Sequence, residues 1–119
     1  MICEDRPMAS IEVEEVAPGE FRLYLVAGTT AVDGVIVELG HEPNGPFWAG
    51  MAELIVATEA PELDGRFWTD SEADAFLAHS EDRAVLDDLA ARLRTVAADE
   101  ARLRGLMDLA TSRGHAFDD

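Results

Sequence analysis

The sequence predicts an α+β fold in which two β-hairpins join into one antiparallel sheet and helices pack on one face of it. Three observations lead to this fold class. Apolar residues alternate with polar ones in two early segments, which is the period of a strand, and two short later segments flank an acidic turn as the strands of a hairpin do. Four other segments space their apolar residues at helical intervals. The resulting order is ββααββαα, without the alternating strand and helix units of a parallel sheet.

The first hairpin is predicted near the N-terminus. Residues 11–16 alternate apolar and acidic side chains, and residues 21–26 place three large apolar side chains on one face. Pro18 and Gly19 lie between them and form a turn pair. Because two neighbouring strands pair most locally as antiparallel partners, we expect a hairpin with one wet face.

Residues 30–39 fit two patterns. Their Val-Ile-Val run favours a strand by propensity. Four of their apolar residues nevertheless have the i, i+3, i+4, i+7 spacing of a helix, and Gly40 stands where a left-handed residue ends one. We therefore predict a helix, followed by a loop over residues 41–46, which contain two prolines.

The second hairpin is predicted from residues 66–69 and 75–79, two short strands on either side of an acidic turn. One of the two tryptophans, Trp68, lies in this hairpin, and the other, Trp48, lies in a preceding helix. Exposed tryptophans often anchor protein interfaces, but filling the core is the more common role. We expect both to be buried.

Three further helices complete the prediction. The first runs from about residue 47 to 58 and is followed by a proline. A long helix starts at Ser80 or Asp82, either of which is a good capping residue. The last helix begins near Asp99 and ends at Gly114. Each of the three carries an apolar stripe, which the sheet and its neighbours can bury.

The composition is strongly acidic. Acidic residues outnumber basic ones by 25 to 9, which gives a formal net charge of −16. Because nucleic-acid backbones and anionic membranes bind to basic surfaces, we expect neither as a partner. The same charge permits fast, salt-sensitive capture of a basic protein, although acidity also serves solubility alone.

The ends of the chain suggest a location. The first residues lack the basic start and the apolar run of a signal peptide, and no apolar run approaches the roughly 20 residues of a membrane span. Cys3 is the only cysteine, so no internal disulfide can form. We expect a cytoplasmic protein whose residues 1–119 form one domain, with loose termini at 1–10 and 114–119.

The sequence offers no arrangement for nucleophilic catalysis, which needs a nucleophile, a base and an orienting group together. The histidines are predicted in a loop (His41), near the end of a strand (His79) and in the C-terminal tail (His115). His79 and Ser80 are strand neighbours and therefore point to opposite faces. Paired carboxylates arise by chance among 25 acids. We expect no enzyme, no catalytic residue and no cofactor.

The acidic turn has a partial likeness to a calcium loop. Asp70, Glu72 and Asp74 alternate as calcium ligands do, but the glycine that a calcium loop needs at position six is missing. Ala75 stands at position six, and although Glu81 stands at position twelve, residues 75–79 before it are predicted to form a strand and not a loop. We therefore expect no metal site.

What remains is a surface. Residues 70–88 contain seven acids and one base, and we expect these acids to cluster on the second hairpin and the first turn of the long helix. Carboxylates at a helix start have a structural role because they favour the positive end of the helix dipole. That role explains the two acids nearest the long helix but not those of the turn. The predicted partner-binding residues are Asp70, Glu72, Asp74, Glu81 and Asp82.

Two stretches carry a family resemblance. Residues 39–48, Leu-Gly-His-Glu-Pro-Asn-Gly-Pro-Phe-Trp, followed by Gly-Met-Ala at 50–52, resemble the Gly…Gly-aromatic-x-Trp-x-x-Leu-Ala segment of the immunity protein 51 family. Residues 67–80 are similar to that family's Phe-Asp-x-Glu-x-x-Met-Phe-x-Ala-Tyr-Ser hairpin. This chain departs from the hairpin motif at Trp68, where the family often has an aspartate nearby, and at His79, which replaces a common tyrosine. The resemblance covers about residues 30–110.

The resemblance implies a function that the composition permits. Such proteins act as cytoplasmic antidotes in bacterial polymorphic toxin systems, each binding and blocking one secreted toxin domain. No catalytic residues are implied. Stoichiometric occlusion of a basic cleft suits the acidic surface, and a nuclease toxin has such a cleft because it must attract phosphates. Two alternatives stay open: a small acidic adaptor or regulator of another endogenous protein, and an enzyme that uses a carboxylate pair.

Overall fold

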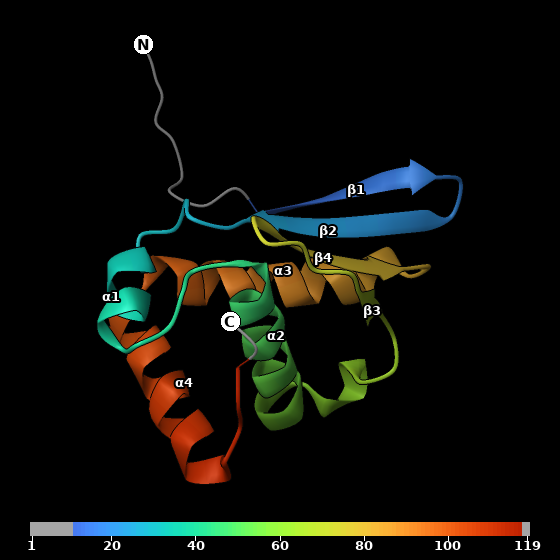
Figure 1. The fold of residues 1–119 in the computed structure, drawn as a ribbon. Helices are drawn as coiled ribbons and strands as arrows, with labels where there is room; N and C mark the ends of the chain where they lie inside the picture. Colours follow the sequence, from blue (N-terminus) through green and yellow to red (C-terminus); the bar gives the residue numbers. More distant parts are fainter. Residues whose placement is uncertain (1–10, 118–119) are drawn as a thin grey trace.

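In the computed structural model, which describes residues 11–117, four antiparallel strands form one sheet in the order β1-β2-β4-β3 (Figure 1). β1 (Ile11–Ala17) and β2 (Glu20–Val26) form the first hairpin, and β3 (Trp68–Thr69) and β4 (Ala75–Ser80) form the second. β2 pairs with β4, so the two hairpins join along their inner strands. The predicted sheet is therefore confirmed.

The helices lie on one side of this sheet, as predicted (Figure 1). α3 runs beneath β1, β2 and β4, whereas α2 packs on β4. The core forms where these helices meet the inner face of the sheet, and its largest members include Leu23, Phe76, Trp48 and Leu89, all without exposed surface. The helices are α1 (Asp33–Glu38), α2 (Gly45–Glu59), α3 (Arg83–Ala98) and α4 (Glu100–Arg113), with a short 3-10 helix, η1 (Pro61–Leu63), after α2.

Short polar side chains fix the helix starts. The side chain of Asn44 accepts a hydrogen bond from the Phe47 N–H at 2.9 Å, and that of Asp99 accepts one from the Ala101 N–H at 3.0 Å. Such caps satisfy backbone donors that the first helical turn leaves without partners. Gly114 ends α4 in the left-handed conformation at φ 70°, as predicted.

The helix predicted within residues 30–39 is present but shorter than its apolar pattern. Val32, Val35 and Ile36 are buried, while Leu39 lies beyond the helix and is 37% exposed. The Thr30 hydroxyl donates to Asp33 Oδ1 at 2.6 Å, which holds the chain at the helix start. Leu39, the last residue of the predicted stripe, therefore lies outside the core, because α1 ends one residue before it.

The C-terminal segment differs from the expectation of a loose end. His115 Nε2 lies 2.9 Å from the Gly50 carbonyl oxygen, and the ring of Phe117 stacks on that of Phe47 with 4.9 Å between centroids. Gly50 permits this contact, since a Cβ there would lie 2.6 Å from Cδ1 of Phe117. Residues 114–117 thus continue past α4 onto α2. Residues 1–10, including Cys3, and residues 118–119 lie outside the described part of the chain.

Ion pairs cross-link the helices. Glu59 at the end of α2 pairs with Arg102 of α4 and lies 3.6 Å from Arg92 of α3. Arg92 Nε also donates to Asp88 at 2.8 Å, and this hydrogen bond, with the nearby acidic charges, raises the pKa of the Arg92 guanidinium. Within residues 11–117, six of the eight arginines form ion pairs with acids. Most of the scarce positive charge is therefore already neutralised within the fold.

Candidate partner-binding surface

The acidic turn between β3 and β4 is held by backbone contacts. The Gly45 N–H donates to the Ala73 carbonyl at 3.1 Å, and the Ala27 N–H donates to the Asp74 carbonyl at 2.9 Å. Gly45 is also where the turn comes closest to α2, because a Cβ there would lie 1.8 Å from the Glu72 carbonyl oxygen. The first residue of α2 therefore must be a glycine for the turn to lie where it does.

The carboxylates of this turn are exposed and without ion-pair partners. Glu72 forms an isolated antiparallel β-bridge with Ala75, and the Asp70 N–H donates to the Leu77 carbonyl at 2.9 Å. Opposed residues of antiparallel strands share a face, so Asp70 and Glu72 follow Leu77 and Ala75 onto the side of the sheet away from the helices. Neither they nor Asp74 forms an ion pair with any residue between 11 and 117. The turn thus presents three uncompensated negative charges.

Glu81 and Asp82 lie between β4 and the start of α3, in a group separate from Glu72 and Asp74 of the turn. They follow the far end of β4, whose six residues separate them from Glu72 and Asp74 by roughly 20 Å at strand rise; Asp70 lies opposite Leu77, four residues before Glu81. Asp82 also has local roles, since it caps α3 through the Ala84 N–H at 3.0 Å and pairs with Arg66 at 2.9 Å. A full strand between the two acidic segments keeps them apart.

The face of the sheet away from the helices is aromatic and apolar at its centre. Cross-strand register places Trp68 of β3, His79 of β4 and Arg22 of β2 in one row. The Trp68 ring stacks on the His79 ring at 5.7 Å, with 57% of the tryptophan exposed. We call this surface the open face; its central residues are Trp68, His79, Leu77, Tyr24, Val26 and Ala75, and Arg22, Glu12 and Glu14 lie toward β1.

Sequence reasoning missed this surface because it assigned Trp68 to the core. Trp48 is fully buried, as expected, but Trp68 is not. A signal was present in β4, where Phe76, Ala78 and Ser80 are buried on the helix side, so their alternates had to point outward. The side chain of His79 therefore points to the opposite face of the sheet from that of Ser80, as predicted, so the two cannot act as a catalytic dyad.

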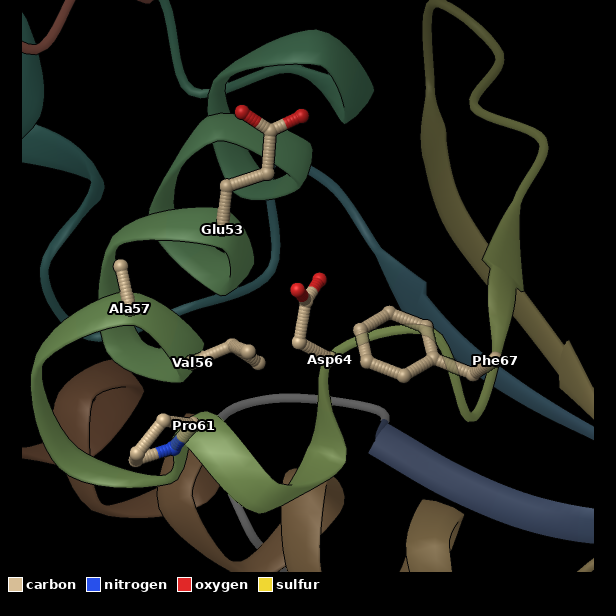
Figure 2. A pocket seen from close by; sticks show the side chains of 6 residues that line it. All are labelled: Glu53, Val56, Ala57, Pro61, Asp64 and Phe67. Carbon is tan, nitrogen blue, oxygen red and sulfur yellow. The ribbon is translucent and has the colours of Figure 1, made fainter.

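A pocket of about 240 Å³ lies between α2, η1 and the segment before β3. Figure 2 shows the carboxylates of Glu53 and Asp64 beside this space, with the ring of Phe67 next to Asp64. Its remaining walls are apolar, from Val56, Ala57 and Pro61. His79 is absent from the lining, so the pocket does not combine a carboxylate pair with this histidine. The pocket lies along the second half of α2, whereas the acidic turn contacts the first residue of that helix.

Two kinds of site are absent from the part of the chain that the structure describes. Between residues 11 and 117, no three His, Cys, Asp or Glu side chains come together in a group able to hold a metal ion. None of the helices in this range combines the length and the apolar character that crossing a membrane requires.

Comparison with known proteins gives one match. A family model described as immunity protein 51 matches residues 11–112, which is most of the chain. Searches of curated proteins and of solved structures return no match. The resemblance noted over residues 30–110 is thus confirmed and extends to the first hairpin.

Proposed function

This chain belongs to the immunity protein 51 family, and on that premise we propose that it binds a cognate bacterial toxin domain and neutralises it. Neutralisation is by stoichiometric occlusion: the bound protein covers the cleft through which the toxin reaches its substrate. The proposed place of action is the cytoplasm of the producing cell. Occlusion needs no turnover, in keeping with the generally non-enzymatic character of immunity proteins.

The observation that carries this proposal is the acidic turn on its fixed backbone. Asp70, Glu72 and Asp74 are exposed and without ion-pair partners in residues 11–117, and their turn accepts main-chain hydrogen bonds from Gly45 of α2 and from Ala27, just after β2. A fixed group of negative charges attracts a basic cleft over a distance and lowers the ordering cost of binding. A nuclease toxin supplies such a cleft, because its substrate is polyanionic.

Co-expression tests the proposal. The proposed cognate toxin domain, sought among the genes beside this one, is induced with or without this chain, and we expect survival only with it, together with co-purification of the two proteins at equal stoichiometry. Death in both cultures, or survival without a complex, would contradict neutralisation by occlusion.

Charge neutralisation tests the role of the turn. We expect Asp70→Asn combined with Glu72→Gln to slow association by about 3- to 10-fold at low salt, with a smaller loss at 0.5 M NaCl. The matched control is Asp108→Asn with Glu62→Gln, which makes the same charge change at two exposed acids of α4 and η1. Equal slowing by both pairs would assign the effect to net charge and remove the turn from the interface.

A further inference from the structure

The open face departs from the usual surface of a half-buried sheet. Antiparallel sheets with one solvated side place polar residues there. β1 follows this rule with Glu12 and Glu14, whereas β4 turns Leu77 and His79 outward and β2 turns Tyr24 outward. With Trp68 beside them, these residues form an apolar centre that no helix in residues 11–117 covers (Figure 1).

The composition of this centre is that of an interface core. Tryptophan, tyrosine and arginine are the residues most enriched among those that dominate binding energies, and they cluster at interface centres inside a polar rim. Here Trp68 of β3 lies on one side of β4, and Tyr24 and Arg22 of β2 lie on the other. Trp68 is large, 57% exposed and held in orientation by its stack on His79. An anchor that is already oriented loses little side-chain entropy on binding.

The edges of the sheet do not offer an equivalent site. At β1, the guanidinium of Arg94 donates to the Ile11 carbonyl at 2.8 Å, and that of Arg83 donates to the Val13 carbonyl at 3.3 Å. These outward carbonyls are the ones that an added strand would need. β3 has only two residues. Neither edge therefore offers an added strand a long row of available backbone groups.

The charges around the open face define the partner. Glu12 and Glu14 border it on the β1 side, and Asp70 and Glu72 border it at the turn. Its one base, Arg22, is already paired with Glu14. A second copy of this chain would set acidic borders against each other, and each copy carries a formal charge of −16. A partner with a basic surface and an apolar depression would complement both the acidic border and the apolar centre of the open face.

We infer that the open face is the docking surface for the toxin domain, with Trp68 as the anchor that enters an apolar depression beside the toxin's basic cleft. This inference rests on the proposed function and deepens it. It extends the contact region from the acidic turn across β3, β4 and β2.

The test uses the toxin domain encoded beside this gene, purified as a catalytically inactive variant. We expect Trp68→Ala to weaken binding at least about 30-fold, mainly through faster dissociation. The matched control is Val37→Ala on α1, since Val37 is similarly exposed at 59% but lies away from the sheet. Its affinity should stay within about 2-fold of wild type. Thermal unfolding of both variants establishes that they are folded.

A second measurement needs no substitution. The chain has two tryptophans, one buried and one exposed, so 5-fluorotryptophan labelling gives two ¹⁹F resonances. On addition of unlabelled toxin domain, we expect the Trp68 resonance to shift and to lose its H₂O/D₂O isotope shift, while the Trp48 resonance stays in place. Without toxin, the Trp68 resonance should not change with chain concentration.

The outcomes separate the two proposals. If wild type neither protects cells nor binds the toxin domain, the proposed function fails. If wild type binds and protects, but Trp68→Ala binds as tightly and the Trp68 resonance is unchanged, only the docking surface is wrong. A concentration-dependent shift without toxin would assign the open face to a second copy of this chain and overturn the inference.

Discussion

Replacing Gly45 with alanine perturbs the point where the acidic turn meets α2. A Cβ at this position would lie 1.8 Å from the Glu72 carbonyl oxygen and 2.3 Å from that of Ala75. Unstrained contacts between non-bonded heavy atoms begin at about 3.5 Å, so the turn and the helix must separate by more than about 1 Å. Both contacting atoms belong to the backbone, and a rotamer change cannot relieve them.

The cost follows from the contacts that such a separation strains. Overpacking a tight contact destabilises by about 1–3 kcal/mol. The Gly45 N–H to Ala73 carbonyl hydrogen bond, 3.1 Å long, contributes about a further 1 kcal/mol if it breaks. We therefore expect Gly45→Ala to lower the free energy of unfolding by about 2–4 kcal/mol, and Tm by roughly 8–16 °C for a chain of this size.

Gly105 supplies the matched control. It lies in the middle of α4, is exposed, and has nothing within 4 Å of an added Cβ. Alanine is the better helix former there, so Gly105→Ala should stabilise by about 0.5–1 kcal/mol. Circular dichroism during heating measures both variants. If Gly45→Ala raised Tm as Gly105→Ala does, the close approach of turn and helix would be refuted, and with it the fixed position of the acidic turn.

Three further substitutions test contacts elsewhere in the fold. Asn44→Ala removes the cap of α2 and should lower the free energy of unfolding by about 1 kcal/mol in urea denaturation, while Asn44→Asp should retain most of it. Glu59→Gln removes the acid that Arg92 and Arg102 share and should cost about 0.5–1.5 kcal/mol, less in 0.5 M NaCl. Because folding raises the pKa of Arg92, the stability that its charge contributes is fully present at neutral pH and is lost only in strongly alkaline solution. The cost of Glu59→Gln should therefore be the same at pH 7 and pH 9. Phe117→Ala should lower Tm by a few degrees because the ring stacks on Phe47; an unchanged Tm would mean that the C-terminal segment does not pack on α2.

The sequence predicted the parts of the fold that local patterns determine. Alternation in residues 11–16 and 21–26 is long enough to define a face, and the helical stripes extend over several turns. The placement of Trp68 failed for the opposite reason, since a two-residue strand has no pattern of its own and takes its orientation from pairing with β4. The packing of Phe117 depends on the absence of a side chain at Gly50, far away in sequence.

The candidate site was predicted only in part. Composition identified Asp70, Glu72 and Asp74 as exposed acids, because a turn rich in carboxylates faces solvent in almost any fold. It gave no information on what lies beside them. The open face appears only when cross-strand register places residues of β2, β3 and β4 side by side, and the separation of Glu81 from the turn follows from the direction in which β4 runs.

The acidic turn and the open face belong to one backbone frame, and we expect them to act at different stages of toxin binding. Charges at a rim act mainly during approach, whereas a buried aromatic anchor acts after contact. Neutralising Asp70 and Glu72 should therefore change the association rate and its salt dependence, and removing the Trp68 ring should change the dissociation rate. Asp70 follows Trp68 by only two residues. A variant that combines Trp68→Ala with the substitutions of Asp70 and Glu72 therefore also tests whether a change at one residue shifts the other. Effects that multiply would show that turn and anchor act independently on a frame that does not rearrange.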